Sequence, residues 1–245
     1  MIVTKGLTKV YGEVRAVENL DLEVHPEEMF GFLGPNGAGK TTTIRILTTL
    51  TKPTLGHAWI NGFNVVKNPR QVRREFGIVQ QHLSMDWELT VWEILELHAR
   101  LHHLMPDDRR RRISELLDYI GLAKQANQLV RELSEGMKRR VMIARALIHY
   151  PKVLFLDEPT AGVDAQSRRH VWDMIRGMNS DGTTVFLTTH YIEEAEALCQ
   201  RVGIIHQGQM IALGSPLELR LHLGLVTVET LSNNKNTHYH YFPDR

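Results

Sequence analysis

A complete phosphate-binding loop lies near the start of the chain and constrains its fold more than any other feature. Residues 34–41 read Gly-Pro-Asn-Gly-Ala-Gly-Lys-Thr, which matches the pattern G-x-x-x-x-G-K-[ST] in full. The apolar run at residues 29–33 predicts a strand before the loop, and residues 42–50 predict a helix after it. In this setting the backbone N–H groups of the turn and of the helix N-terminus point at one anion. The sequence therefore predicts a nucleoside triphosphate site.

The positions of the loop have distinct expected roles. Its glycines let the backbone turn tightly while successive N–H groups face the phosphates. Lys40 is expected to reach the β- and γ-phosphates, and the hydroxyl of Thr41 is expected to bind Mg²⁺. The nucleotide-binding residues that we predict here are Gly34, Pro35, Asn36, Gly37, Ala38, Gly39, Lys40, Thr41 and Thr42.

The composition narrows the class of protein. A chain of 245 residues suits one α/β domain, or a large domain with a smaller one inserted. Lys plus Arg number 29 against 28 for Asp plus Glu, a balance that argues against a broad nucleic-acid-binding face. The single cysteine, Cys199, excludes a disulfide framework. Because the sequence has neither a membrane-span pattern nor a signal-peptide pattern, we expect that another chain would hold it at any membrane.

Apolar periodicity divides the chain into three segments. Short strands and turns alternate up to about Asn64, residues 83–150 are rich in helix, and buried strands return afterwards. Strands separated by helices predict a largely parallel sheet. The polar tail from about Leu223 predicts a small hairpin or a frayed end. The later strands are predicted at residues 153–156, 184–187 and 203–205.

The helical segment carries two helix starts. Thr90 and Glu93 form a capping box that opens a helix through Leu101. A second helix starts at Pro106, and its apolar side chains are predicted to share one face. These side chains are Ile113, Leu116, Leu117 and Ile120.

Two clusters in this segment invite functional interpretations that we set aside. The four arginines at residues 109–112 could bind acidic lipid headgroups, but we expect a solvated helix face. His98, His102 and His103 have the spacing of metal ligands, yet no carboxylate or cysteine partner lies nearby in the sequence.

A pair of acids follows the strand predicted at residues 153–156. Asp157 and Glu158 come directly after these apolar residues, and a buried parallel strand delivers its carboxyl end to the crevice where ligands bind. There Asp157 would hold Mg²⁺ through its water shell, and Glu158 would orient the water that attacks the γ-phosphate. The alternative is a strand that merely ends in a polar turn. The loop upstream favours the catalytic interpretation.

Three further motifs accompany the loop and the acid pair. Residues 133–140 read Leu-Ser-Glu-Gly-Met-Lys-Arg-Arg, residues 161–164 read Ala-Gly-Val-Asp, and residues 187–190 read Leu-Thr-Thr-His. In this order and spacing, residues 2–220 resemble the ATP-binding subunit of an ABC transporter. The form Ser-x-Gly-Met-Lys-Arg-Arg, with Thr-Thr-His-Tyr-x-Glu-Glu-Ala-Glu after it, resembles the branch that serves exporters of drugs and other hydrophobic or glycosylated molecules.

The resemblance implies a fold and an assembly. The fold would be α/β: a P-loop NTPase core with a mainly parallel sheet, an N-terminal antiparallel β subdomain and an inserted helical subdomain. Residues 1–220 would form a single ATP-binding domain with the insert at about 83–150, and residues 221–245 would form a tail of unknown role. ATP and Mg²⁺ would be bound. Two chains, identical or related, would enclose two ATP molecules. A separate multispan permease would hold them at the cytoplasmic face of the cell membrane, without nucleic acid.

The resemblance also assigns roles residue by residue. Tyr11 matches the aromatic residue that stacks on adenine, although a tyrosine in a turn could instead pack locally. Gln81 matches the glutamine that ligates Mg²⁺ and senses the γ-phosphate, with Gln80 as a neighbouring alternative. His190 matches the switch histidine that contacts the γ-phosphate, and Asp164 matches the aspartate that crosses the dimer interface. The implied catalytic residues are Glu158 and His190, and the implied metal ligands are Thr41, Gln81 and Asp157.

Ser134 precedes a helix and occupies the position of an N-cap, where a hydroxyl and free N–H groups form an anion site. By the resemblance, Ser134 and Gly136 complete the ATP pocket of the partner subunit. Glu135 departs from the family pattern, in which glycine is usual. Its carboxylate would repel a triphosphate unless it points away or meets Lys138 or Arg139.

Three functions remain open from the sequence. The first is an energy-coupling ATPase whose membrane partner contacts the helical insert around residues 82–101. The second is an ATP-gated clamp on nucleic acid or ribosomes, but relatives of that kind usually carry tandem ATP domains, long coiled coils or zinc modules, which are not present in this sequence. The third is a regulatory subunit that hydrolyses ATP poorly, for which Glu135 is the only support.

Overall fold

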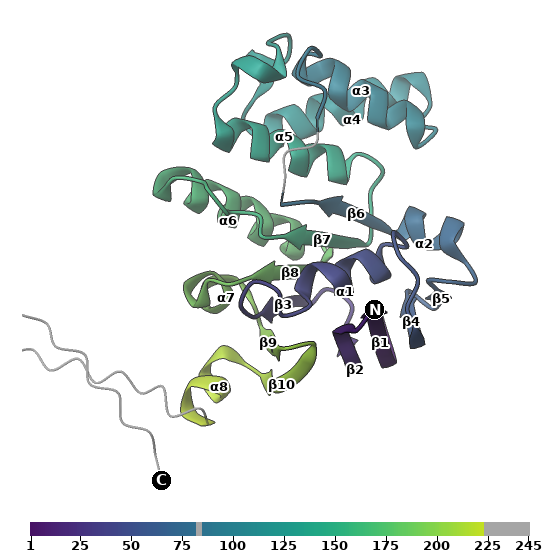
Figure 1. Cartoon of the computed structure of the whole chain (residues 1–245). Helices are drawn as coiled ribbons and strands as arrows, with labels where there is room; N and C mark the ends of the chain where they lie inside the picture. The colour runs from purple at the N-terminus through teal and green to yellow at the C-terminus, as the bar shows by residue number, and fades with distance from the viewer. Residues whose placement is uncertain (82–84, 223–245) are drawn as a thin grey trace, which may run out of the picture.

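A computed structural model describes residues 1–81 and 85–222, and its larger sheet forms the centre of the fold (Figure 1). The strand order is β10-β9-β3-β8-β7-β6. Every neighbouring pair runs parallel except β9 and β10, which are antiparallel. The strands are β3 (Met29–Leu33), β6 (Phe76–Val79), β7 (Val153–Asp157), β8 (Thr184–Thr189), β9 (Arg201–His206) and β10 (Gln209–Gly214). This confirms the predicted mainly parallel sheet.

A second, antiparallel sheet is formed by the first part of the chain. Its order is β2-β1-β4-β5, and Gly12 lies in the tight turn between β1 and β2 with a φ of +57°. Its strands are β1 (Ile2–Tyr11), β2 (Val14–Val24), β4 (Leu55–Ile60) and β5 (Phe63–Asn64). The predicted N-terminal antiparallel sheet is therefore present.

Alternation along the parallel strands creates two hydrophobic cores. Phe155 and Phe186 face one core, which they share with α1 (Lys40–Leu47) and with the antiparallel sheet. Leu154 and Leu187 face the opposite core, which includes side chains of α5 (Glu135–Leu147), α6 (Ala165–Ser180) and α7 (Ile192–Leu198). A strand buried on both faces explains why the sequence runs of these strands are uniformly apolar. The remaining helices beside the sheets are α2 (Pro69–Glu75) and α8 (Pro216–His222).

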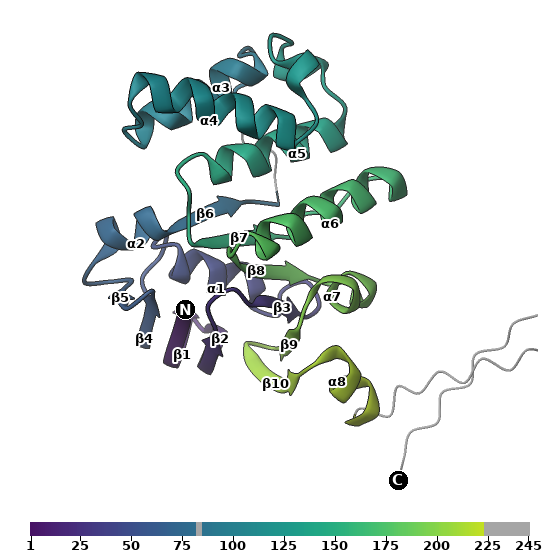
Figure 2. The same ribbon diagram turned by 180° about the vertical axis from the view of Figure 1, so that it is seen from behind.

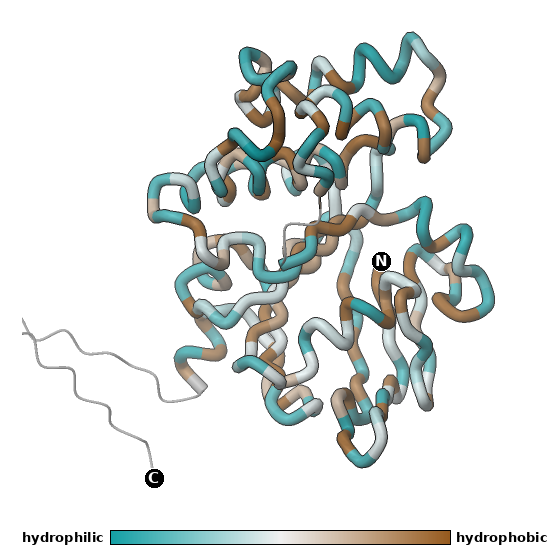
Figure 3. Tube along the Cα trace, turned by 45° about the horizontal axis from the view of Figure 1, so that its top comes forward, coloured by the Kyte–Doolittle hydropathy of each residue, from teal (hydrophilic) through white to brown (hydrophobic). Residues whose placement is uncertain are grey.

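The segment between β6 and β7 is helical and lies at one end of the molecule. Figures 1 and 2 show α3 (Val91–Leu101) and α4 (Pro106–Tyr119) beyond α5, far from the antiparallel sheet. Brown and teal alternate along these helices in Figure 3, as expected of amphipathic helices. Two short 3₁₀ helices, η1 (Ala123–Gln125) and η2 (Val130–Glu132), connect α4 to α5.

The helix starts predicted for this segment are confirmed. The backbone N–H of Thr90 donates to Glu93 Oε2 at 2.8 Å, and the backbone N–H of Glu93 donates to Thr90 Oγ1 at 3.2 Å. This reciprocal pair satisfies two donors at the start of α3, which ends at Leu101 as expected. Helix α4 begins at Pro106, and its predicted apolar face is buried.

Several sequence-based boundaries and environments differ from the structure. Helix α1 begins at Lys40 and ends at Leu47, whereas residues 42–50 were predicted, because the left-handed backbone lies at Gly39 and Thr49. The prediction that the arginines at residues 109–112 form a solvated helix face is only half correct. Arg109 is mostly buried and pairs with Glu96, and Arg112 stacks over the Tyr150 ring with 3.8 Å between its guanidinium carbon and the ring centroid. Long arginine stems cover apolar surface even where their charges find partners.

Two predictions fall on residues that the structure does not describe. The polar tail from Leu223 lies outside the described residues, as do residues 82–84 at the start of the proposed partner-contact region. Of the helices that the structure does describe, none combines the length and the apolar character needed to cross a bilayer.

Candidate active site

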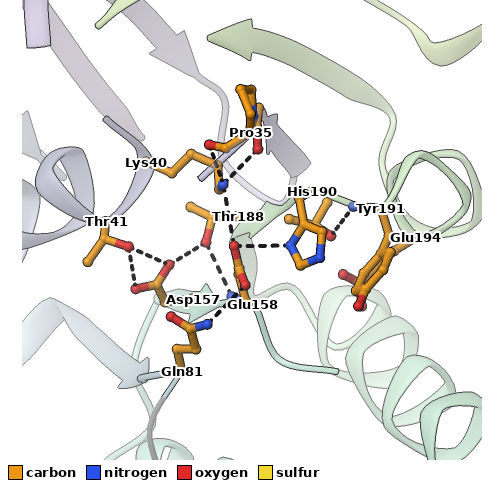
Figure 4. Close-up of polar contacts among 12 residues, drawn as sticks. Pro35, Lys40, Thr41, Gln81, Asp157, Glu158, Thr188, His190, Tyr191 and Glu194 are labelled. Atoms are coloured by element: carbon orange, nitrogen blue, oxygen red, sulfur yellow. Dashed lines mark hydrogen bonds and ion pairs between the residues drawn. The ribbon is translucent and has the colours of Figure 1, made fainter. Parts of the chain in front are cut away.

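The predicted nucleotide residues converge at the carboxyl ends of the central strands. The phosphate-binding loop follows β3, Asp157 ends β7, and His190 follows β8. Figure 4 shows the side chain of Lys40 pointing to Glu158 and that of Thr41 pointing to Asp157 at this edge of the sheet. The structure thus gathers at one place residues that lie far apart in the sequence, as expected of a site at the strand ends of an open α/β sheet.

The loop backbone requires glycine at two positions for steric reasons. Gly39 has a φ of +111°, and a Cβ there would lie 2.3 Å from the carbonyl oxygen of Ala16. A Cβ on Gly34 would lie 2.3 Å from the carbonyl oxygen of Ile205. Carbon cannot approach a backbone oxygen so closely, so any side chain at either position would displace the loop. The spacing of the glycines in the motif therefore reflects packing of the loop as well as its conformation.

The side chain of Lys40 is held by the backbone of the phosphate-binding loop, to which it belongs. Its Nζ donates to the carbonyl oxygens of Gly34 at 2.7 Å and of Pro35 at 3.1 Å, and it lies 3.3 Å from Glu158 Oε1. Only 5% of Lys40 is exposed. The ammonium group is thus fixed beside the loop, where an incoming phosphate would meet a positive charge with little freedom left to lose.

A threonine lies on each side of the Asp157 carboxylate. Thr41 Oγ1 donates to Asp157 Oδ2 at 3.1 Å, and Thr188 Oγ1 donates to Asp157 Oδ1 at 2.5 Å. Asp157 and Thr188 are both buried. These bonds fix the orientation of a carboxylate that burial would otherwise penalise. The Thr188 contact is missing from the sequence-based site, although the run Leu-Thr-Thr-His at the end of β8 contained the signal.

Glu158 is contacted at both carboxylate oxygens. His190 Nδ1 lies 3.2 Å from Oε1, the oxygen that also faces Lys40, and Gln81 Nε2 donates to Oε2 at 3.1 Å. The backbone of Glu158 has a φ of +49°, a left-handed conformation that is uncommon outside glycine, and its N–H donates to the carbonyl oxygen of Thr188 at 3.0 Å. Strained backbone of this kind concentrates at functional sites.

Four further predicted residues come from other elements, namely Tyr11 from β1, Ser134 and Gly136 from the start of α5, and Asp164 from the N-cap of α6. Tyr11 is 44% exposed, and Lys9 Nζ lies 4.8 Å from its ring centroid. The Ser134 hydroxyl caps α5 by accepting from the Met137 N–H at 3.3 Å, as predicted. A Cβ on Gly136 would lie 2.6 Å from the hydroxyl of Ser167.

Asp164 caps α6. It accepts from the N–H groups of Gln166 at 3.0 Å and Ser167 at 2.9 Å. The hydrogen bonds with Ser167 hold the pKa of Asp164 below its ordinary value. The side chain is therefore ionised and oriented by the positive end of a helix.

Glu135 contacts one of the two cations that the sequence offered. Its Oε1 lies 3.0 Å from Lys138 Nζ, and that ammonium group lies 4.6 Å from the Trp87 ring centroid. The Glu135 carboxylate thus meets Lys138, one of the two cations that could compensate its charge.

Sequence reasoning missed two buried contacts around the site. Arg139 on α5 donates to the backbone carbonyl oxygens of Gln80 and Gln81, and Glu194 on α7 accepts from Thr160 Oγ1 at 2.7 Å. Both link a side chain to a segment distant in sequence, so neither leaves a local pattern. The histidines of the helical segment form no metal cluster: within the described residues, no three His, Cys, Asp or Glu side chains could hold an ion.

The parallel sheet has a phosphate-binding loop after β3 and an acid pair at the end of β7, which lies two strands away. This arrangement defines a P-loop nucleoside triphosphatase. Comparison with known families is more specific. The family model described as "ABC transporter" matches residues 17–161, and the chain belongs to this family. It is an ATP-binding subunit with ATPase activity coupled to transport.

Individual relatives and a solved structure agree with this assignment. The chain is 44% identical over 223 residues to the daunorubicin resistance ATP-binding protein DrrA3 of Streptomyces coeruleorubidus, covering 91% of this chain and 71% of the relative. It is 43% identical over 215 residues to Nod factor export ATP-binding protein I of Cupriavidus metallidurans, covering 88% and 71%. The ATP-binding cassette MJ0796, in a dimeric post-hydrolysis state bound to ADP and Pi, superimposes with a TM-score of 0.80 at 30% identity, covering 88% of this chain and 99% of that one.

Proposed function

We propose that this subunit powers the export of a small drug-like, hydrophobic or glycosylated molecule. The names of the relatives support this cargo class, because one confers daunorubicin resistance and another exports Nod factor. The permease would be a separate multispan chain, and the subunit would lie at the cytoplasmic face of the cell membrane. ATP binding and hydrolysis would then drive the permease between conformations, because ATP binds one conformation of the assembly more tightly than the other.

The contacts of Glu158 carry the proposed division of roles. Lys40 and the loop N–H groups bind the β- and γ-phosphates, and Glu158 orients the attacking water. His190 and Gln81 hold the two oxygens of the Glu158 carboxylate, at 3.2 Å and 3.1 Å, so that its lone pairs have a fixed direction. A general base acts only when its geometry relative to the attacking group is fixed, which is what these contacts provide.

The residues beside the loop fit a bound Mg²⁺. The Thr41 hydroxyl and the Asp157 carboxylate lie within 3.1 Å of each other, and both offer the oxygen donors that Mg²⁺ prefers. Gln81 supplies a further amide group at the same edge of the sheet (Figure 4). When bound, Mg²⁺ would neutralise charge on the phosphates of ATP. Hydrogen bonds from Thr41 and Thr188 fix the orientation of the Asp157 carboxylate.

Dimerisation would complete each ATP site. We propose a homodimer, or a heterodimer with a related chain, in which Ser134 and Gly136 of one subunit meet the ATP bound by the other. Asp164 would reach across the interface, and the exposed ring of Tyr11 would stack on adenine. The N-terminus of α5 supports this role, because a helix start capped by serine offers N–H groups to an anion.

The domain organisation follows from the same proposal. Residues 1–220 would form one ATP-binding domain, and the helical segment at about 83–150 would be its insert. The permease would contact residues 82–101, of which the structure describes 85–101. Residues 221–245 would form a tail of unknown role.

The decisive experiment is a purification from native membranes. The tagged chain is extracted in detergent, co-purifying proteins are identified, and ATP turnover is measured in the complex and in the isolated chain. We expect a multispan permease at stoichiometric amounts and turnover that changes with its presence. The Lys40→Ala chain is the control for contaminating ATPases. Recovery with ribosomes or nucleic acid, and without a membrane protein, would contradict the proposal.

A further inference from the structure

Arg139 connects helix α5 to Gln80 and Gln81, the two residues that follow β6. Its Nη1 donates to the carbonyl oxygen of Gln80 at 2.9 Å, and its Nη2 donates to the carbonyl oxygen of Gln81 at 3.0 Å. A guanidinium group is planar, so two such bonds fix both the position and the orientation of the bonded backbone. One side chain thereby sets the path of the chain where it leaves β6.

The burial of Arg139 indicates that this contact is costly to build. Only 4% of the residue is exposed, and in the described part of the chain its Nε is buried without a hydrogen-bond partner. Burial lowers the pKa of Arg139, while the carboxylates of Glu135 and Glu194 raise it. A buried guanidinium is tolerated when acids and acceptors surround it, and a neutral side chain would pack here at lower cost. A neutral apolar side chain, however, could not donate the two hydrogen bonds to the carbonyl oxygens of Gln80 and Gln81.

The contact extends into the active site through Gln81. Arg139 donates to the backbone of Gln81, and the side-chain Nε2 of Gln81 donates to Glu158 Oε2 at 3.1 Å. Gln81, Glu135 and Arg139 also line one cavity of about 300 Å³ together with residues 161–163, which follow the acid pair. Arg139 is therefore separated from the Glu158 carboxylate by a single residue.

We propose that Arg139 is a positioning residue that fixes Gln81 so that its amide holds Glu158. The inference rests on the proposed roles of Gln81 and Glu158 and deepens them.

Arg140 provides a matched control on the same helix. Its Nη1 donates to the carbonyl oxygen of Ile120 at 2.8 Å, so it also binds a backbone carbonyl, but on the side of α4 rather than of Gln81. Arg139→Ala and Arg140→Ala each remove one guanidinium group from α5. Comparing them separates the effect on Gln81 from a general loss of helix packing.

The experiment measures kcat and KM for ATP, equilibrium ATP binding and thermal unfolding in the full-length chain. For Arg139→Ala we expect kcat to fall on the order of tenfold with KM within about twofold, and for Arg140→Ala we expect kcat within about twofold of wild type. Arg139→Lys keeps the charge but lacks the planar pair of donors that binds two carbonyl oxygens at once, so we expect an intermediate kcat. Equal loss of kcat in Arg139→Ala and Arg140→Ala would overturn the inference.

A double substitution tests whether Arg139 acts through Gln81. If it does, Arg139→Ala adds nothing to Gln81→Ala, because the amide that it positions is already gone. Two outcomes would show a packing role and overturn the inference. One is additive losses of kcat in the double variant, and the other is a kcat that falls in parallel with the melting temperature across the Arg139 variants. Wild-type turnover in Gln81→Ala would refute the proposed role of Gln81 itself. If Gln81→Ala turned over ATP slowly while Arg139→Ala kept wild-type turnover, only the inference about Arg139 would be refuted.

Discussion

The ammonium group of Lys40 lies 3.3 Å from a carboxylate oxygen of Glu158, with both side chains buried. The residue proposed to bind phosphate and the residue proposed to orient water thus share one ion pair. In a buried pair each charge depends on the other, because removing one partner leaves the remaining charge desolvated and unpaired. Substitutions at either position therefore affect stability as well as activity, and the two effects must be measured separately.

Lys40→Ala should abolish hydrolysis and weaken ATP binding. The substitution removes the charge that neutralises the β- and γ-phosphates, so we expect turnover to fall on the order of a hundredfold or more. It also leaves the buried Glu158 carboxylate without its lysine partner, which we expect to lower the free energy of unfolding by roughly 3 kcal/mol. Turnover, equilibrium nucleotide binding and chemical denaturation check these effects.

The control for the stability effect is Lys40→Ala combined with Glu158→Gln. Removing the second charge should recover part of the lost stability without restoring turnover. Near-normal turnover in Lys40→Ala would contradict the assignment of the loop.

Glu158→Gln should separate ATP binding from chemistry. Glutamine preserves the size of the side chain but lacks the carboxylate that orients water. We expect ATP to bind, hydrolysis to stall, and a stable dimer to accumulate with Mg²⁺ and ATP. Size-exclusion chromatography with and without nucleotide measures the dimer. A monomer under all conditions would count against the ATP-sandwich arrangement.

The sequence predicted those parts of the molecule that depend on local pattern. The loop, the acid pair at the end of β7 and the capping box at Thr90 each have a short motif whose physical cause lies within a few residues. The contacts of Arg139 and Glu194 could not be predicted in this way. Each depends on the tertiary path of a distant segment, and an arginine or a glutamate on a helix looks the same whether it faces solvent or a buried carbonyl.

The error at residues 109–112 has the same origin. Four consecutive arginines beside acids indicate a solvated face, but a helix exposes only part of its circumference. Arg109 and Arg112 lie on the flank that meets other elements, where Glu96 and Tyr150 supply partners from outside α4. The sequence contained the partners, but no local pattern linked them to these arginines.

The stability of the chain should depend on pH through two half-buried histidines, His98 and His149. Burial lowers the pKa of His98 and of His149 from 6.5 to about 4, and His149 also stacks on His102 with 3.8 Å between ring centroids. The unfolded chain therefore takes up protons as the pH falls below 6.5, while the native chain does so only near 4. We expect stability to be complete above pH 6.5 and to fall between 6.5 and about 4.

Chemical denaturation across this pH range tests the prediction. His149→Phe retains a ring that can stack and removes the titrating group, so the pH slope of the unfolding free energy should become shallower. His25→Gln is the matched control, because the side chain of His25 is 59% exposed. An unchanged slope in His149→Phe would assign the acid sensitivity to other groups.

Glu135→Gly tests the one position where the chain departs from its family inside the proposed ATP constellation. The Glu135 carboxylate lies 3.0 Å from Lys138 Nζ, so its charge is compensated on its own helix. An i,i+3 ion pair on a helix contributes about 0.2–0.5 kcal/mol, and glycine adds a backbone-entropy cost of about 1 kcal/mol relative to alanine. We therefore expect a small loss of stability and a turnover at saturating ATP within about twofold of wild type.

Glu135→Gln separates charge from backbone effects, and it should change turnover as little. If the carboxylate instead opposed the partner's γ-phosphate, both variants would hydrolyse ATP much faster and dimerise at lower ATP. A rise well beyond twofold in both would show that the Lys138 pair does not shield the site.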